Sequence, residues 1–370
     1  MFLRKLVGPD VLYSSVIKGN AYGHGIDTFL PLAEECGVRH FSVFGANEAR
    51  EALRSRTESS EILVMGHMDE DEVEWAIEND VSFFVSDPSC LELAKKKSRR
   101  IGKPARAHLE LETGLHRTGL EEKALDDALS CARERPDALQ VEGVCTHLAG
   151  AESSANYLRI QEQLARYGSL CTRVREALGI EPKRHVACSA AAITYPETVL
   201  DMVRIGIAQY GYWPSEETRI RYALEHGSKE GKRLRDPLQR VIQWVSRIAG
   251  VKCVAEGDFV GYGNSYLATR PMTVASVPVG YYHGFPRNLS NLGHVLVHGK
   301  RAAVVGRVNM HLMMVDVTEC SPVRVGDEVV VVGKQGRAQI TFQSFTALTQ
   351  NINYEALVRI PVSIPRVVVG

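Results

Sequence analysis

Eight short apolar runs, rich in β-branched residues, recur through the first 210 residues and constrain the fold more than any other feature of the chain. Between them lie stretches with apolar residues at three- and four-residue spacing and charges between, the pattern of amphipathic helices. Strands that alternate with helices of this length form a parallel sheet. We therefore predict strands at Leu12–Ile17, His40–Gly45, Glu61–Gly66, Val81–Ser86, Ala105–Leu111, Leu139–His147, Arg184–Ser189 and Met202–Ile207.

Eight strand–helix units of this size are typical of a (β/α)8 barrel. The charge-rich, helix-like stretch Trp213–Arg240 is interpreted as a linker or an insertion. We predict an α/β plus all-β chain, with a (β/α)8 TIM-type barrel over residues 1–235 and a β domain over residues 236–370.

The pattern changes from about Val241 onward, because short strands then follow one another closely, with Gly, Pro and Asp turns between them. This is typical of an all-β sandwich or barrel. The strands predicted there are Val245–Ala255, Met272–Val279, His294–Val297, Ala302–Val308, Met313–Val317 and Glu328–Val332.

Composition excludes several classes of function. The 370 residues are 45% hydrophobic, enough for large cores, and 44 Lys and Arg balance 44 Asp and Glu. No net field therefore attracts nucleic acid or an anionic membrane. No window approaches the roughly 20 apolar residues of a membrane span, and the N-terminus lacks signal-peptide features. Eight cysteines without a C-x-x-C pair predict reduced, buried thiols and a cytoplasmic protein.

Polar side chains stand at the carboxyl ends of several predicted strands. Lys18 follows the first strand, Arg117 the fifth, His147 ends the sixth, Ser189 ends the seventh, and Arg204 lies in the eighth. Taken singly, a lysine at a strand end is usually a solvated surface group, and a lone histidine is more often structural. In a barrel, however, the carboxyl ends of the strands meet at one face, where function collects. Their convergence predicts an active site.

Lys18 has the most informative surroundings, in the run V-I-K-G-N-A-Y-G-H-G. A nucleophilic or Schiff-base lysine needs a confined site that favours the neutral amine or imine. The glycines allow the backbone to approach a ligand closely, and Tyr22 offers a donor to a phosphate. This run resembles the signature of the alanine racemase family, whose members are fold-type III pyridoxal-phosphate enzymes.

The resemblance extends along nearly the whole chain and implies pyridoxal 5′-phosphate, bound to Lys18 as a Schiff base. The segments that carry it are L-E-T-G-L-H-R-T-G, T-H-L-A, H-V-A-C-S-A-A, M-V-R-I-G-I-A-Q-Y-G and I-N-Y-E. They imply contacts to the phenolic oxygen from Arg117, to the pyridine ring from His147, to its nitrogen from Arg204, and to the phosphate from Tyr22, Ser189, Gly206, Ile207 and Tyr354.

The segment V-G-Y-G-N-S-Y in the second domain resembles the one that carries a second catalytic base, which is Tyr262 here. Inverting an α-carbon needs a base on each face, and Lys18 and Tyr262 would serve the two faces. A tyrosine is mostly protonated at neutral pH, so it needs a cationic or hydrogen-bonding neighbour, for which His147 and Arg117 are candidates. The resemblance further implies substrate contacts from Arg117, Tyr281 and the Met310 backbone amide.

Arg204 bears on the type of reaction. A guanidinium only donates hydrogen bonds, so it disfavours a proton on the pyridine nitrogen and weakens the ring as an electron sink. This favours racemisation over decarboxylation. The resemblance also implies a homodimer in which the partner subunit supplies the second base.

The chain departs from the family pattern at three places. Glu110 replaces a lysine that is carbamylated in many members, which predicts an ion pair with Arg117, directly or through water, or a repositioned Arg117. His283 and His311 replace acidic residues beside Tyr282, and they are either structural or part of an entrance that admits another substrate. Lys18 also stands unusually near the N-terminus, so either the true start lies upstream or the β domain lost an edge strand.

The predicted activity is interconversion of L- and D-alanine, with a small amino acid as substrate and without metal or nucleic acid. A broad-specificity or serine racemase and a non-catalytic pyridoxal-phosphate-binding homologue stay open as alternatives. Arg204 and Tyr262 disfavour a basic amino-acid decarboxylase of the same fold type. An aldolase with a His/Cys metal pair finds weak support, because only Cys320 follows His311, and a single-barrel homologue would lack the second domain.

Overall fold

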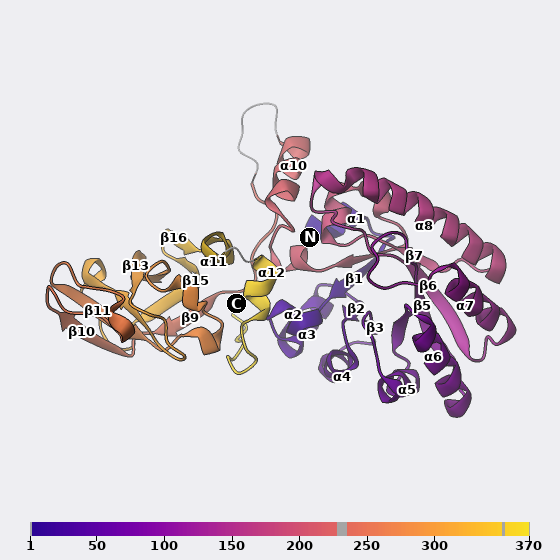
Figure 1. Ribbon diagram of the computed structural model, residues 1–370, viewed down its shortest axis with the longest axis horizontal. Coiled ribbons are helices and arrows are strands. Elements are labelled where there is room, and N and C mark those ends of the chain that lie inside the picture. Colours follow the sequence, from indigo (N-terminus) through magenta and orange to yellow (C-terminus); the bar gives the residue numbers. More distant parts are fainter. Residues whose placement is uncertain (1, 228–234, 350–351, 370) are drawn as a thin grey trace. The chain divides into compact units, whose positions relative to one another are not determined.

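A computed structural model of the chain describes residues 2–227, 235–349 and 352–369. These residues divide into two compact units. The first consists of the residues up to 21 and residues 25–240, and the second of residues 22–24 and those from 241 onward. Each unit is built around its own β-sheet (Figure 1). Within the described ranges, every helix is too short or too polar to cross a membrane.

The first unit is a parallel barrel, as predicted. Among the described residues its eight strands follow the order β7-β6-β5-β4-β3-β2-β1-β8, and neighbouring strands pair in parallel. Each predicted run overlaps a strand, but the seventh extends too far, because β7 ends at His185 and Ser189, predicted to end that strand, begins the helix α9. The strands are β1 (Leu12–Val16), β2 (His40–Val43), β3 (Glu61–Val64), β4 (Ser82–Val85), β5 (Ala105–Glu110), β6 (Leu139–Cys145), β7 (Lys183–His185) and β8 (Met202–Ile205).

The barrel nearly closes between β7 and β8, through hydrogen bonds that involve β7 itself and the residues that follow it. The Arg204 amide donates to the Ala187 carbonyl at 2.9 Å, and the Asp201 amide donates to the Arg184 carbonyl at 3.2 Å. Cys188 and Arg204 form an isolated parallel bridge. The backbone of Arg204 therefore lies at the seam of the nearly closed barrel.

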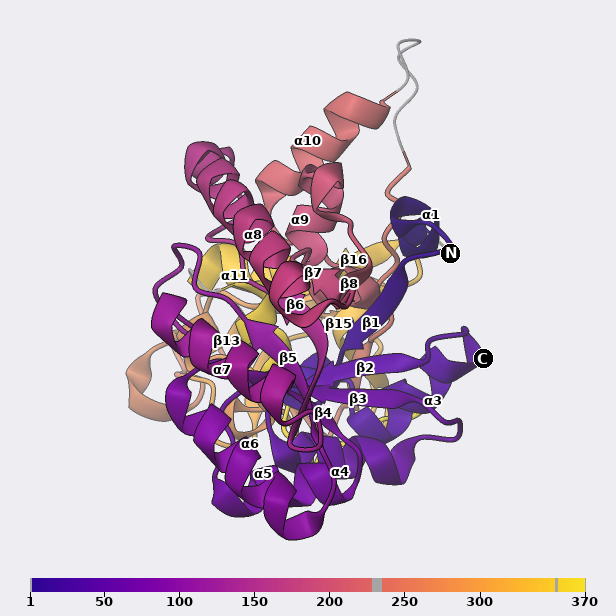
Figure 2. The same cartoon turned by 90° about the vertical axis from the view of Figure 1, so that its right-hand side faces the viewer.

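Helices surround the strands (Figure 2). Their apolar faces follow from residue spacing, as in α4, where Ala46, Ala49 and Ala52 recur every third residue and are buried. The helices of this unit are α1 (Phe2–Val7), α3 (Ile26–Glu35), α4 (Ala46–Ser55), α5 (Glu70–Glu78), α6 (Pro88–Ile101), α7 (Glu122–Glu134), α8 (Tyr157–Leu178), α9 (Ser189–Thr194) and α10 (Glu216–His226). The short turn α2 (Lys18–Tyr22) has a left-handed backbone and ends at a residue of the second unit. Helix α10 lies in the predicted linker, of which residues 228–234 fall outside the described residues.

The barrel interior contains both apolar and ionisable side chains. Leu63, Phe84, Cys145 and Met202 form one buried apolar cluster. Three buried imidazoles accompany it in the same unit, those of His40, His108 and His185. Because buried polar groups need hydrogen-bond partners, these histidines must be ordered by specific contacts rather than by packing alone.

The second unit is antiparallel, as predicted. Its main sheet follows the order β10-β11-β14-β13-β12-β15-β16, and β9 pairs with β15. Its core includes the fully buried Phe285, Leu296 and Val330. The elements are β9 (Trp244–Arg247), β10 (Gly250–Val254), β11 (Met272–Val277), β12 (His294–Val297), β13 (Lys300–Val305), β14 (Met313–Asp316), β15 (Glu328–Gln335), β16 (Ala338–Ile340), α11 (Phe342–Thr349) and α12 (Asn353–Val358).

The prediction of one strand over Val245–Ala255 is wrong, because β9 and β10 pair with different strands. β9 pairs with β15, whereas β10 pairs with β11. The backbone changes partner between them, since the Ile248 amide donates to Asp327 at 2.9 Å and the Ala249 amide donates to Ser276 at 2.8 Å. A switch of this kind depends on distant strands, so the apolar pattern alone did not reveal it.

All eight cysteines lie within the described residues and are free thiols, as expected. Cys90, Cys131, Cys145 and Cys320 are buried. Cys36 and Cys253 are exposed, so the expectation that the thiols are buried is wrong for these two. They lie on solvent-facing surfaces, at the end of α3 and within β10.

We predict that acid destabilises the barrel through His40. Burial lowers the pKa of this imidazole from 6.5 to about 3, and its Nδ1 lies 2.8 Å from the Ser14 hydroxyl. Between those two pH values the unfolded chain binds a proton that the folded chain does not, so stability falls as pH falls, by up to about 1.4 kcal/mol per pH unit.

Urea unfolding at several pH values measures this slope. His40→Asn places an amide near the position of Nδ1 and should flatten the slope by about one proton. His67→Asn is the control, because His67 is exposed and should leave the slope unchanged. An unaltered slope in His40→Asn would contradict the assignment.

Candidate active site

Lys18 follows the end of β1, which is fixed by residues that follow β8, the neighbouring strand. The Val16 carbonyl accepts hydrogen bonds from Gln209 Nε2 and Tyr210 Oη, both at 2.9 Å. The Ser15 hydroxyl in turn donates to Gln209 Oε1 at 2.8 Å. Sequence reasoning missed Gln209 and Tyr210, because they stand almost 200 positions along the chain from the strand that they hold.

The chain turns into a left-handed conformation immediately after Lys18. Gly19, Asn20, Ala21 and Tyr22 have φ angles of 63°, 53°, 52° and 51°. For residues other than glycine this conformation costs about 1–2 kcal/mol each, so it persists only where other contacts enforce it. Consecutive residues of this kind next to the predicted Schiff-base lysine mark a strained, specifically built segment.

The carboxylate of Glu48, on α4, holds this left-handed turn. Its Oε1 accepts the amides of Gly19 at 2.6 Å and Asn20 at 3.3 Å, and its Oε2 accepts the Phe44 amide at 2.8 Å. Charge-assisted bonds of this type are stronger than neutral ones and can offset part of the conformational cost. Sequence reasoning missed Glu48, whose position within a helix is that of an ordinary solvated carboxylate.

Lys18 lies in a cationic environment. Desolvation lowers the pKa of its amine, the guanidinium groups of Arg117 and Arg204 lower it further, and the charge of Glu48 opposes this shift, while part of the side chain stays open to solvent. The described residues give Lys18 no ion pair within 4.0 Å. Such an amine is shifted toward its neutral, nucleophilic form.

Arg204 is buried and is bound by acceptors of the barrel. Its Nη1 donates to His185 Nδ1 and to the His185 carbonyl, the latter at 2.9 Å, and its Nη2 donates to the Thr146 carbonyl at 2.9 Å. A guanidinium has five N–H donors. Two of them have no acceptor among the described residues and are available to a ligand.

His147 stands where β6 has ended and is held neutral. Burial lowers its pKa to about 3, and the nearby charges of Arg204, Arg117 and Lys18 act in the same direction. Its carbonyl accepts a hydrogen bond from Gln163 Nε2 at 3.1 Å. The four side chains predicted at this end of the barrel therefore do influence one another electrostatically.

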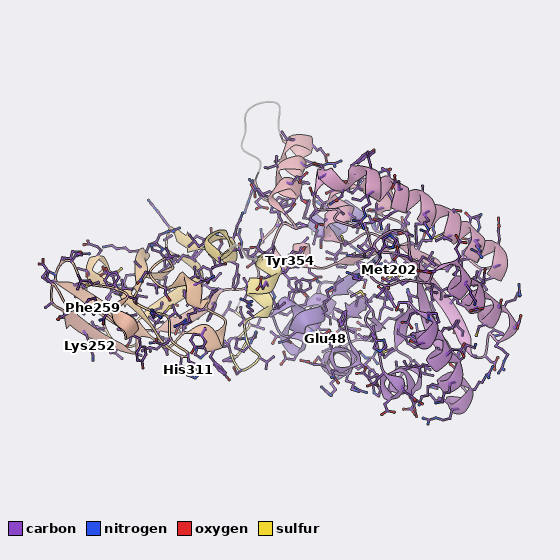
Figure 3. The ribbon with its side chains drawn as sticks, viewed as in Figure 1. Glu48, Met202, Lys252, Phe259, His311 and Tyr354 are labelled. Atoms are coloured by element: carbon purple, nitrogen blue, oxygen red, sulfur yellow. The ribbon has the colours of Figure 1, made fainter. Side chains whose placement is uncertain are left out.

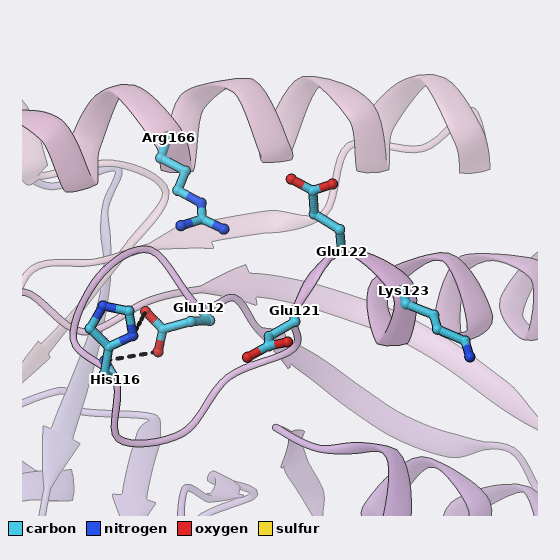
Figure 4. A pocket seen from close by; sticks show the side chains of 6 residues that line it. All are labelled: Glu112, His116, Glu121, Glu122, Lys123 and Arg166. Carbon is cyan, nitrogen blue, oxygen red and sulfur yellow. Dashed lines mark hydrogen bonds and ion pairs between the residues drawn. The ribbon is translucent and has the colours of Figure 1, made fainter.

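Arg117 lies on an exposed turn that Glu112 organises. The Glu112 carboxylate accepts the amides of Gly114 and His116, the latter at 3.0 Å, and Figure 4 shows it turned toward His116. A pocket of about 320 Å³ lies beside this turn, lined by Glu112, His116, Glu121, Glu122, Lys123 and Arg166. None of the predicted site residues lines it, so it is separate from the site around Lys18.

Glu110 is buried near the same arginines. Desolvation raises its pKa, whereas a Thr118 hydrogen bond and the charges of Arg204 and Arg117 oppose that rise. The ion pairs among the described residues do not include a direct one between Glu110 and Arg117. Of the alternatives considered for this position, the direct ion pair is therefore not observed.

Ser189 is buried at the start of α9. Its hydroxyl oxygen accepts the amides of Gly206 at 3.0 Å and Ala208 at 3.3 Å, while the hydroxyl hydrogen stays available for a ligand. The Gly206 amide, predicted to bind a phosphate, is thus used by Ser189 in this structure. Ile207, between them, is buried.

Tyr22 and Tyr354 belong to the second unit, where they lie together. Their ring centroids are 5.9 Å apart. The backbone of this short segment is held within the same unit, since Arg366 Nη2 donates to the Gly23 carbonyl at 2.6 Å. The two tyrosines predicted at the phosphate are therefore neighbours, although more than 300 positions separate them.

Tyr262 lies in an exposed turn of the second unit. It is 72% exposed, and Gly261, Gly263 and Asn264 around it have positive φ angles of 75°, 72° and 47°. Asn291 Nδ2 donates to the Ser265 carbonyl at 2.9 Å and so ties the turn to a neighbouring loop. The phenol is thus presented to the outside on a firmly held loop.

Tyr281 and Met310 lie on adjacent segments of the same unit. The amide of Tyr281 donates to Asn309 at 3.1 Å, and the amide of Tyr282 donates to the Met310 carbonyl at 3.0 Å. A side chain at Gly280 would overlap the carbonyls of Asn309 and Met310, so this approach requires glycine. Tyr281 is 43% and Met310 51% exposed.

His283 and His311, predicted to replace acidic residues of the family pattern, form one aromatic cluster with Tyr282. The ring centroids lie 4.8 Å apart for Tyr282 and His311 and 5.3 Å apart for His283 and His311. Figure 3 labels His311 in the second unit. The His283 Nδ1 accepts the Gly280 amide at 3.1 Å, and desolvation followed by the charge of His311 lowers its pKa.

Two family models cover nearly the whole chain. The model for the N-terminal domain of alanine racemases matches residues 2–214, and the model for their C-terminal domain matches residues 241–368. Among curated proteins, an alanine racemase of Desulforamulus reducens is 37% identical over 100% of this chain and 95% of its own length. One of Leptospira interrogans is 34% identical over 99% of this chain and 91% of its own.

Solved structures agree in fold. The alanine racemase of Streptomyces lavendulae superposes over 100% of this chain and 93% of its own length, with a TM-score of 0.88 and 31% sequence identity. That of Bartonella henselae, described with covalently bound pyridoxal phosphate, matches 97% of this chain and 92% of its own, with a TM-score of 0.78 and 26% identity.

We predict that Glu48→Gln loosens the turn after Lys18. One carboxylate oxygen would become an amide donor facing backbone amides, and losing a charged acceptor costs about 1.5–3 kcal/mol. Amide hydrogen exchange at Gly19 and Asn20 should become faster. Glu51→Gln, on the same helix, is the control and should leave exchange there unaltered. Equal protection of Gly19 in Glu48→Gln and wild type would contradict the proposed contact.

Proposed function

The chain belongs to the alanine racemase family, and we propose how its own residues perform the interconversion of L- and D-alanine with pyridoxal 5′-phosphate. The observation that carries the proposal is that Lys18, which has no ion pair within 4.0 Å among the described residues, lies under the influence of the charges of Arg117 and Arg204, both of which lower the pKa of its amine. A lysine in such surroundings suits attachment of an anionic aldehyde, because Schiff-base formation starts from the neutral amine and the arginines attract the anion.

The residues around Lys18 offer the hydrogen-bond donors and the positive charge that suit this cofactor. The two spare N–H donors of Arg204 suit the unprotonated nitrogen of the pyridine ring. The buried Ser189 hydroxyl can donate to a phosphate oxygen. Tyr22 and Tyr354, which lie together, would donate to the same phosphate, with the backbone amides of Gly206 and Ile207 as further donors. Arg117 and the neutral His147 would flank the ring.

Two proton-carrying groups then perform the racemisation. When bound, the cofactor makes the Cα–H of an attached amino acid acidic. Lys18 Nζ removes or returns the proton on one face of Cα, and Tyr262 Oη does so on the other. Arg117, Tyr281 and the Met310 amide would orient the substrate and its carboxylate. Because Arg204 keeps the ring a weak electron sink, direct proton exchange is favoured over other reactions of the amino acid.

We propose that the active protein is a homodimer with shared sites. A catalytic phenol needs a site from which bulk water is largely excluded, yet Tyr262 is 72% exposed in the single chain. Tyr281 and Met310 are exposed on the same unit. Covering by a second copy would bury these side chains against its Lys18, and closed symmetry would give two equivalent sites.

Incubation with L-alanine in D₂O tests the activity. The protein loaded with pyridoxal phosphate should form D-alanine that carries deuterium at Cα. The same experiment with L-serine separates a serine racemase from an alanine racemase. If neither these nor any other amino acid exchanges its α-proton, the racemase assignment fails.

Lys18→Ala should abolish the near-visible absorbance of the bound cofactor and reduce racemisation by several orders of magnitude, because the Schiff base has no other proposed partner. Lys123→Ala, an exposed lysine of the same unit, is the matched control and should keep both. Absorbance retained in Lys18→Ala would show that a different lysine binds the cofactor.

Tyr262→Phe removes the proposed second base while keeping the ring. Exchange of the α-proton with solvent should fall by about 10²–10⁴-fold for one enantiomer and much less for the other, since Lys18 still serves its own face. Following deuterium uptake separately from L- and D-alanine measures the asymmetry. Equal losses for both enantiomers would argue against a base on each face.

A further inference from the structure

A line of polar side chains, buried except for the partly buried Glu142, leads from Arg204 into the barrel. His185 Nε2 lies 2.8 Å from His108 Nδ1, and His108 Nε2 lies 3.9 Å from Glu142 Oε2. His108 and His185 are 2% or less exposed. In spatial order, this line therefore consists of the Arg204 guanidinium, the His185 and His108 imidazoles and the Glu142 carboxylate.

The guanidinium determines where each imidazole carries its proton. Arg204 only donates, so the His185 Nδ1 that it contacts must accept and carry no proton. A neutral His185 then has its proton on Nε2, where it donates to His108 Nδ1. His108 must consequently carry its own proton on Nε2, the nitrogen nearest to Glu142.

Both imidazoles are neutral in this setting. Burial lowers the pKa of His108 and of His185 well below the ordinary value of 6.5. The charges of Arg204, Arg106 and Lys183 and the neighbouring His40 act on His108 in the same direction. A second proton on either ring would also place a donor against the donor of its neighbour.

Strands β5 and β6 depart from regular pairing next to the His108 ring. A side chain at Gly143 would overlap the His108 ring, and the register of β5 and β6 shifts between Ala107 and His108. Such an irregularity re-aims a side chain. The Phe84 ring lies against both imidazoles, at centroid distances of 6.4 Å and 6.1 Å, and limits their movement.

Glu142 is fixed at the far end of the line. Arg106 Nε donates to its Oε1 at 2.6 Å, and the Ser82 hydroxyl donates to its Oε2 at 3.0 Å. Ser82 and Arg106 lie at the beginnings of β4 and β5. The line thus connects the side of the barrel where strands start to the site at which they end.

We propose that His185 and His108 are positioning residues for Arg204. The guanidinium fixes the tautomer of both imidazoles, so that each carries its proton on Nε2 and the Nε2–H of His108 faces Glu142. With these tautomers, the Nδ1 and the carbonyl of His185 both accept from Arg204. The remaining N–H donors of Arg204 are thereby directed at the cofactor nitrogen. This role rests on the proposed function, whereas the proton order itself is a property of the protein without cofactor.

Nitrogen-15 NMR of histidine-labelled apoprotein tests the proton order directly. We expect an unprotonated Nδ1 and a protonated Nε2 in both rings. Arg204→Met removes the donor that imposes the order, and both rings should then become tautomeric mixtures. A proton on Nδ1 of His185 in the wild type, or an unchanged order in Arg204→Met, would overturn the proposal. Neither result depends on whether the protein racemises alanine.

A matched pair of variants tests the positioning role. In His108→Asn the amide oxygen can take the place of Nδ1 and accept from His185, whereas in His108→Gln the amide lies near Nε2 and leaves His185 without its acceptor. With Gln we expect a mixed His185 tautomer, a shifted cofactor absorbance and a kcat lowered about tenfold with little change in KM. With Asn the His185 tautomer should persist and kcat should stay within about threefold. Equal behaviour of the two variants in these readouts would show a purely structural role and overturn the proposal.

Discussion

The buried charge of Arg204 is the constraint on which the site depends. A guanidinium cannot lose its proton at any ordinary pH, so the barrel around it must supply acceptors. It does so with a ring nitrogen, a carbonyl of the same histidine and a carbonyl just beyond β6. The consequences spread outward, because an accepting His185 must donate on its other side, and space for its neighbour requires a glycine in β6.

The strained backbone after Lys18 is stabilised by the charge of a carboxylate. The left-handed residues after Lys18 are unfavourable in isolation, and the Glu48 carboxylate lies against their amides. The Glu48 carboxylate compensates the backbone, and the Lys18 amine has no ion pair within 4.0 Å among the described residues, although the charge of Glu48 opposes the lowering of its pKa. A negative group placed at Lys18 itself would have favoured the charged amine, which is the less reactive form. The negative charge of Glu48 is thus used at the backbone amide of Gly19, one residue after Lys18.

Much of the fold follows from short-range patterns in the sequence. The barrel strands were predictable because each is a brief apolar run between amphipathic stretches, and Lys18 was identifiable because its motif is contiguous. The division between β9 and β10 was not, since it depends on which distant strands accept the amides of Ile248 and Ala249. Glu48, Gln209 and His108 were missed for the same reason, because their partners are 28 or more positions away. The roles of Tyr262 and Met310 stay predictions from the family resemblance.

The turn after Lys18 also links the site to the order in which the chain is made. Residues 22–24 belong to the second unit, and the Gly23 carbonyl is bound by Arg366, near the C-terminus. A ribosome synthesises Lys18 more than 300 residues before Arg366, while domains generally fold from the N-terminus onward. A barrel still attached to the ribosome therefore lacks the contacts that complete this segment.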